Sequence, residues 1–164
     1  MIPLGLSQAA TVRVGVAHGQ GDRVALVRAS VAVFVLACAI SAVGGLLFAI
    51  MPGFFASWFL DTHSAEAPQV LAYAGPLIII AGLFQLVDGL QAIANGLLRG
   101  LKDARVPMIL ALIAYWPIGF FLAWALAFPL GLGGIGIWLG FLIGLFTAAL
   151  MLCARFYILM RREG

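Results

Sequence analysis

Four long apolar stretches, separated by short polar connections, constrain the fold of this chain more than any other feature. Each is about as long as the 20 residues that an α-helix needs to cross the hydrocarbon core of a bilayer, or longer. They predict helices at about residues 25–59, 69–98, 106–128 and 133–160. A fifth segment, residues 2–17, is short and interrupted by polar residues. It therefore predicts a truncated N-terminal helix.

The composition excludes a soluble domain. Of the 164 residues, 65% are hydrophobic and only 9% are charged, whereas a soluble domain has about 25% charged residues. A soluble core of this size could not bury so much apolar surface. We therefore expect an all-α, polytopic membrane helix bundle with about four full transmembrane helices plus the truncated one.

The basic residues indicate how the bundle is oriented. If successive spans alternate in direction, all nine Lys and Arg residues fall on one side of the membrane, and the other side carries only Asp61 and Glu66. Basic residues accumulate in cytoplasmic loops. We therefore expect the basic loops and the C-terminus in the cytoplasm. Because the basic residues are scattered between spans, the net charge of +3 does not indicate a nucleic-acid partner.

Asp88 is the only formally charged residue in the interior of an apolar stretch. On a helix, it shares about one third of the circumference with Gln85, Gln91 and Asn95. Such a stripe cannot face lipid, where its polar groups would lack partners, so it is predicted to face other helices or a wet cavity. Asp88 precedes Arg99 by 11 residues, which places it roughly 16 Å inside the membrane boundary.

A carboxylate at this depth is costly, and such residues generally serve ion or substrate pathways. A bound sodium ion or a proton would relieve the charge, and a conformational change that wets or dries the pocket would alter the affinity for that cation. An antiporter needs this coupling. The alternative is an aspartate that only hydrogen-bonds neighbouring helices.

The cysteines and histidines show no pattern of a metal or catalytic site. Cys38 and Cys153 lie in apolar stretches without CxxC spacing, and His18 and His63 lie outside the spans. We expect no cofactor and no metal other than sodium at Asp88. An enzyme such as an intramembrane hydrolase is disfavoured.

Three runs of the sequence carry a resemblance to a known family. Residues 5–22 read GLSQAATVRVGVAHGQGD, residues 84–107 contain FQLVDGLQ and LRGLKDARVP, and residues 115–140 contain YW and GIGIWLG. They resemble, in order, the eighth helix, the tenth helix with its following loop, and the eleventh and twelfth helices of multidrug and toxic compound extrusion (MATE) transporters, NorM-like branch. The resemblance covers essentially the whole chain.

The resemblance implies secondary antiport, in which a twelve-helix protein of two lobes exports cationic, amphipathic compounds against a sodium or proton gradient. It assigns Asp88 to the cation site of the C-terminal lobe. The candidate cavity-lining residues are Phe84, Gln85, Gln91, Asn95 and Tyr115. Phe84 stands where some members have a tyrosine, which removes a hydroxyl contact. Pro117 lies one turn before the proline of some members, so the bend in that helix is expected to be shifted.

By the same resemblance, residues 1–164 form a partial C-terminal lobe, from within the eighth helix to the twelfth. The N-terminal lobe and the seventh helix, which carries an acidic partner of the cation site in many members, would be missing. Because alternating access needs two lobes, we expect no transport by this chain alone. The expected partners are membrane lipid, small-molecule drugs or toxic cations, and the missing lobe, in a bacterial plasma membrane.

Two alternatives remain open at this stage. A lipid-linked saccharide flippase of the same superfamily would line its cavity with basic residues, and no basic residue lies in the interior of these spans. A structural membrane subunit that transports nothing would not need the polar stripe around Asp88.

Overall fold

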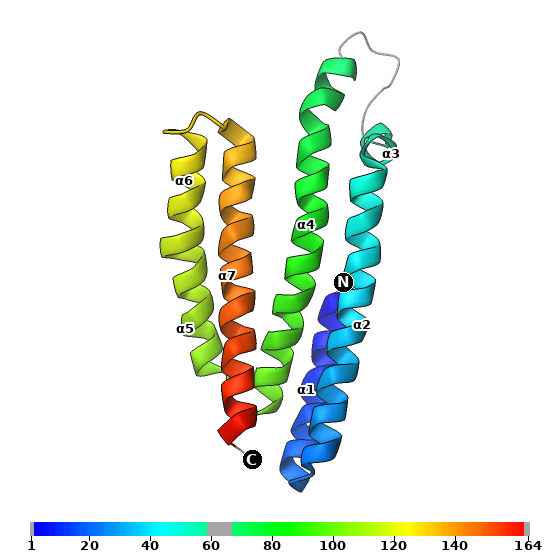
Figure 1. Ribbon diagram of the computed structural model, residues 1–164, viewed down its shortest axis with the longest axis vertical. Helices are drawn as coiled ribbons and strands as arrows, with labels where there is room; N and C mark the ends of the chain where they lie inside the picture. Colours follow the sequence, from blue (N-terminus) through cyan, green and yellow to red (C-terminus); the bar gives the residue numbers. More distant parts are fainter. Residues whose placement is uncertain (1, 59–66, 163–164) are drawn as a thin grey trace.

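A computed structural model describes residues 2–58 and 67–162 of the chain, and its regular structure there is helical throughout. Figure 1 shows the helices side by side as an elongated bundle. Their bounds are α1 Ile2–Gln20, α2 Arg23–Ile50, α3 Pro52–Ser57, α4 Ala67–Gly100, α5 Arg105–Ile113, the π-helix η1 Ala114–Phe120, α6 Phe121–Ala127 and α7 Gly133–Arg162. The predicted all-α helix bundle is confirmed. The connection with Asp61 and Glu66 lies outside the described residues.

Four helical segments within residues 2–58 and 67–162 are long and apolar enough to cross a membrane. They are α2, residues 68–100 of α4, the continuous run of α5, η1 and α6, and α7, with lengths of 28, 33, 23 and 30 residues. They correspond to the four apolar stretches of the sequence, so the chain is a multi-pass membrane protein. The N-terminal helix α1 has 19 residues.

The first of the four long apolar stretches is divided into two helices. The Met51 N–H donates to the Leu47 carbonyl and ends α2, and Pro52 begins the short α3. Proline suits the first position of a helix because its missing N–H would have no partner there. The stretch predicted at 25–59 therefore contains two helices in its described part.

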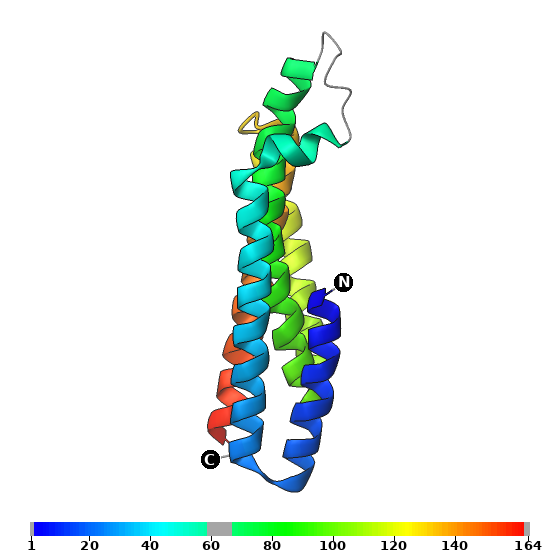
Figure 2. The same ribbon diagram turned by 90° about the vertical axis from the view of Figure 1, so that its right-hand side faces the viewer.

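The helix α4 lies at the centre of the bundle. It packs against α1 and α2 on one side and against α7 on the other, and α7 in turn packs against η1 and α6. Figures 1 and 2 show α1 and α2 together on one side of α4, with α5, α6 and α7 on the other. The largest buried cluster joins α1, α2 and α4 through mostly small or aliphatic side chains: Ala10, Val14, Ala17, Leu26, Ala37, Ile93, Leu97 and Leu101.

Glycines allow the helix axes to approach closely. A methyl group on Gly45 of α2 would lie 2.7 Å from the Gly82 carbonyl oxygen of α4, and one on Gly144 of α7 would lie 2.7 Å from the Cα of Gly119 in η1. Gly140 likewise packs against Ala123 of α6. The small-xxx-small pattern of Gly140 and Gly144 therefore marks the contact of α7 with the preceding span.

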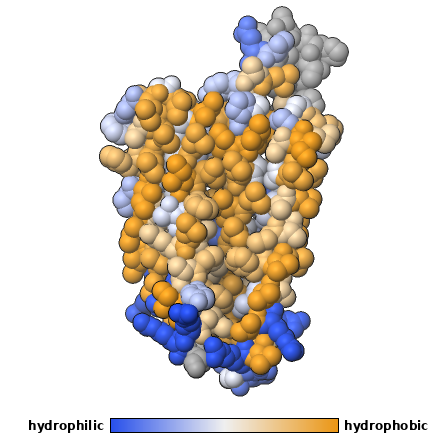
Figure 3. Space-filling model, in the orientation of Figure 1, coloured by the Kyte–Doolittle hydropathy of each residue, from blue (hydrophilic) through white to orange (hydrophobic). Residues whose placement is uncertain are grey.

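The basic segments meet at one end of the bundle. The α1–α2 turn, the α4–α5 turn and the end of α7 all lie at the lower end in Figure 1. Figure 3 shows hydrophilic residues gathered at that end, below a broad hydrophobic band. The helices therefore alternate in direction as the charge pattern requires. That this end faces the cytoplasm stays a prediction.

Candidate functional site

Asp88 lies in the middle of the central helix α4, and its side chain is exposed on the bundle surface. It makes no hydrogen bond or ion pair with any residue that the structure describes. Among the described helices, the carboxylate thus lies on an open face of α4. The sequence predicted instead that it faces other helices or a wet cavity.

The side chains of the predicted polar stripe point toward two different elements, α2 and η1. Gln85 packs toward α2, where its amide nitrogen lies 3.3 Å from the position of a methyl group on Gly44. Gln91 points the other way, and its side-chain amide donates a hydrogen bond to the Tyr115 hydroxyl of η1. Asn95, one turn beyond Gln91, is partly buried.

Gln91 and Tyr115 are thus two of the predicted residues that the structure brings together. Asp88 lies three residues before Gln91 on α4, so the two side chains share one face of the helix. A carboxylate, an amide and a phenol from two different spans therefore form one polar cluster, which we call the Asp88 cluster. Oxygen atoms of this kind are the ligands that hard cations prefer.

Phe84 occupies a different environment from the Asp88 cluster. Its ring packs edge-to-face on Trp138 of α7, with ring centroids 5.4 Å apart and an interplanar angle of 86°. This arrangement suits the quadrupoles of two aromatic rings. Phe84 therefore joins α4 to α7, and without a hydroxyl it offers no hydrogen bond to a cation.

The π-helix η1 presents Tyr115 to the cluster. It covers Ala114–Phe120 and contains Pro117, at the place where the sequence predicts a bend. Proline removes a backbone donor from the helical ladder, and π-helical turns are rare and frequently occur at functional sites. A π-turn holds more residues than an α-turn, so the side chains of this run are rotated relative to a continuous α-helix.

An aromatic hollow adjoins Tyr115. It has a volume of about 220 Å³ and is lined by Tyr115, Trp116, Phe120 and Phe141. Aromatic faces attract cations, so the hollow and the neighbouring carboxylate suit a flat, positively charged compound. Of these four residues, only Tyr115 was predicted from the sequence. Trp116 and Phe120 could have been found from their spacing on one helix, whereas Phe141 comes from α7.

The metal-ligating side chains are sparse. Within residues 2–58 and 67–162, no three His, Cys, Asp or Glu side chains lie together as a metal site. Asp88 can supply one carboxylate to a sodium ion or to a proton.

Comparison with known proteins assigns the family. The MatE family model matches residues 1–125, about three quarters of the chain. The chain belongs to the MatE family. The predicted NorM-like resemblance is confirmed by a MatE relative in Agrobacterium fabrum (strain C58), named "Probable multidrug resistance protein NorM". The two are 64% identical over 163 residues, which cover 99% of this chain and 35% of the relative.

Two solved structures show that the fold is that of MATE transporters. The crystal structure of the eukaryotic MATE transporter AtDTX14 superposes with a TM-score of 0.78 at 24% identity, covering 99% of this chain and 36% of that one. An inward-facing multidrug resistance MATE family transporter of the MOP superfamily superposes with a TM-score of 0.85 at 19% identity, covering 98% and 36%. This MatE chain spans about 35% of the length of the NorM relative.

Proposed function

We propose that this chain is part of a secondary active multidrug efflux antiporter, which exports cationic or amphipathic compounds in exchange for sodium ions or protons. The observation that carries the proposal is the open Asp88 carboxylate beside the Gln91–Tyr115 pair, on a helix in the membrane interior. Membership of the MatE family and the multidrug resistance name of the NorM relative support it.

The chemistry of the Asp88 cluster suits cation coupling. An ionised carboxylate within a membrane is costly, and binding of a sodium ion or a proton lowers that cost. A cationic drug in the aromatic hollow would compete with the coupling ion for the same negative charge. Binding of one cation would therefore disfavour the other, which is the basis of exchange.

Transport requires the rest of the transporter. The chain spans about 35% of its NorM relative, and alternating access needs two lobes that move about a shared site. We propose that other parts of the transporter pack over the open face of α4 and complete the cation site. The protein would lie in the bacterial plasma membrane with its basic end in the cytoplasm.

A chimeric transporter tests the role of Asp88. The matching segment of the Agrobacterium fabrum NorM would be replaced by this chain and expressed in cells that lack efflux pumps. We expect ethidium efflux from the chimera and a loss of at least tenfold in the Asp88→Asn variant, because the amide cannot hold a cation by charge. The driving ion follows from repeating the assay with a sodium gradient or a proton gradient alone.

Asp22→Asn is the matched control, because it removes the same charge. Asp22 caps α2 by accepting a hydrogen bond from the Ala25 N–H at 2.9 Å, and asparagine caps a helix equally well. We expect efflux near the level of the unsubstituted chimera. Equal efflux by the Asp88→Asn and unsubstituted chimeras would refute the coupling role.

A further inference from the structure

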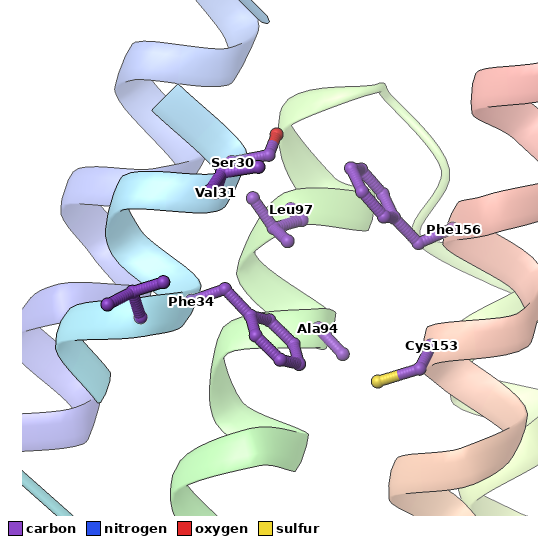
Figure 4. Close-up of a pocket in the computed structure, with 8 residues that line it drawn as sticks. Ser30, Val31, Phe34, Ala94, Leu97, Cys153 and Phe156 are labelled. Atoms are coloured by element: carbon purple, nitrogen blue, oxygen red, sulfur yellow. The ribbon is translucent and has the colours of Figure 1, made fainter. Parts of the chain in front are cut away.

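A second hollow lies between α2, α4 and α7, and its lining includes none of the residues of the Asp88 cluster. It is an open groove of about 280 Å³. Figure 4 shows Val31 and Phe34 from α2, Ala94 and Leu97 from α4, and Cys153 and Phe156 from α7 around it. The groove thus runs between the two halves of the bundle, along the central helix.

The groove offers no free hydrogen-bonding group. Ser30 is the only hydroxyl residue in its lining, and its Oγ donates to the Leu26 carbonyl at 2.8 Å. The rest of the lining consists of hydrocarbon, aromatic rings and a thiol. The volume lies just below the range of about 300–1,000 Å³ for pockets that bury a drug-sized ligand. These properties suit a single hydrocarbon chain better than a drug.

The depth of the groove matches one leaflet of the bilayer. Val31 and Val35 follow Arg23, the first residue of α2, by 8 and 12 residues. At 1.5 Å per residue they lie roughly 12–18 Å from the basic end of the bundle. The half-thickness of the hydrocarbon core is about 15 Å. The end of an acyl chain from the leaflet on the basic side would therefore reach the groove, which lies near the middle of the bilayer.

Positive charge lies at the mouth of the groove. Arg28 precedes Val31 by three residues and Val35 by seven, so it lies on the same face of α2, one turn nearer the basic end. Its side chain is exposed and has no acidic partner among the described residues. Arg23 reaches from α2 to α7 and donates to the Met160 carbonyl at 3.4 Å.

The neighbouring carboxylates at this end are already engaged. Asp22 caps α2, and Asp103 pairs with Arg155 at 2.8 Å. Among the described residues, the charge at the groove mouth is therefore positive, and its complement is an anionic headgroup. Long apolar surface with a basic rim is the pattern that retains anionic lipids.

We propose that the groove between α2, α4 and α7 is a binding site for an anionic phospholipid, with one acyl chain along Phe34, Leu97 and Phe156 and the headgroup phosphate beside Arg28. The proposal rests on the membrane location of the chain and not on its transport activity. The lipid would join the two halves of the bundle where α4 is their main contact.

Lipid retention measures this site directly. The purified chain would be placed in nanodiscs of equimolar phosphatidylcholine and phosphatidylglycerol, and the lipids that remain bound after release would be counted by native mass spectrometry. We expect phosphatidylglycerol to be retained several-fold over phosphatidylcholine. Retention in the equimolar ratio of the disc, or retention of a second copy of the chain in place of lipid, would overturn the proposal.

Two pairs of variants separate the headgroup from the chain. Arg28→Gln should lower the ratio of phosphatidylglycerol to phosphatidylcholine about fivefold, because it removes the positive charge beside the headgroup in the groove, and one such charge contributes about 1 kcal/mol. Arg13→Gln, the same change on α1, should leave the ratio unchanged. Val31→Trp should fill the groove and lower retention of both lipids several-fold, whereas Val43→Trp, at an exposed position of α2 outside the lining, should not.

The lipid retention of the two variants in each pair is compared. Equal ratios for the two arginine variants would exclude a headgroup contact at Arg28, and equal retention by the two tryptophan variants would exclude the groove. Helical content measured by circular dichroism must match the unsubstituted chain. If Val31→Trp fails to fold, Val35→Trp, also exposed and in the lining, takes its place.

Discussion

Two serines at the interfaces of the central helix differ in their hydrogen bonding. Ser7 of α1 donates from its Oγ to the Ala92 carbonyl of α4 at 2.6 Å. Ser41 of α2 is only 2% exposed, and its Oγ has no partner among the described residues. Both serines are small enough to let α4 approach, but only Ser7 adds an interhelical bond.

Alanine substitutions should therefore have different effects at the two serines. Ser7→Ala removes an interhelical hydrogen bond, which in membrane proteins contributes about 0.6 kcal/mol and at most about 1.7 kcal/mol. We expect its free energy of unfolding to fall by about that amount in an SDS titration from mild-detergent micelles. Ser41→Ala removes an unpaired hydroxyl, so the free energy of unfolding should stay within about 0.5 kcal/mol or rise. The reverse order of the two variants would contradict this reading.

The sequence shows the residues of the Asp88 cluster but not their contacts. A lone carboxylate in an apolar stretch is visible in the sequence, and so are Gln91 and Tyr115 as polar residues in spans. The hydrogen bond between Gln91 and Tyr115 is not visible in the sequence, because it joins residues on different helices that are 24 positions apart. Neither Phe141 of the aromatic hollow nor the Phe84–Trp138 contact follows from local spacing.

At the scale of the elements, α1 and α4 terminate in the same way, each in a turn at the basic end of the bundle. Gly21 and Lys102 have positive φ angles of 68° and 61°. After each, an N–H closes the helix end: Asp22 donates to the Ala17 carbonyl at 3.0 Å, and Asp103 donates to the Leu98 carbonyl at 2.9 Å. Glycine is the residue that adopts this left-handed conformation without a Cβ clash.

The substitutions Gly21→Ala and Lys102→Gly should change the free energy of unfolding in opposite directions. Gly21→Ala should lower the free energy of unfolding by about 1 kcal/mol, since an L-residue in the left-handed region costs about 1–2 kcal/mol. Lys102→Gly should raise it by a smaller amount, because glycine also gains freedom in the unfolded chain. The midpoint of thermal unfolding in detergent measures both changes. A loss of stability in Lys102→Gly would show that its side chain contributes more than its backbone strain costs.

The apolar stretches predicted the membrane-spanning elements because length and hydrophobicity are local properties. A proline stands at each of the two irregular places, with Pro52 directly after the break at Met51 and Pro117 within the π-helix Ala114–Phe120. A proline shows where a helical ladder loses a donor. It does not show whether the chain starts a new helix, as at Pro52, or continues through a π-helical run, as at Pro117.

At the scale of the whole molecule, the open face of α4 bears on transport. Asp88 is exposed on this face, and the chain spans about 35% of its NorM relative. We expect that cells without efflux pumps that express this chain by itself extrude ethidium no faster than cells with an empty vector. The physical reason is that alternating access needs two lobes that move about a shared site. Efflux above that baseline, abolished by Asp88→Asn, would contradict the expectation.

The sequence by itself determined that the chain is a membrane helix bundle, where its spans lie, that its basic residues share one end, and that Asp88 is its exceptional residue. These properties depend on hydrophobicity, charge and helical period, which are set by neighbouring residues. Only the tertiary structure decided that α4 is central, that Tyr115 meets Gln91, and that a groove lies between α2, α4 and α7. Those contacts join residues of different helices, and hydrophobicity, charge and helical period within one segment do not place such residues side by side.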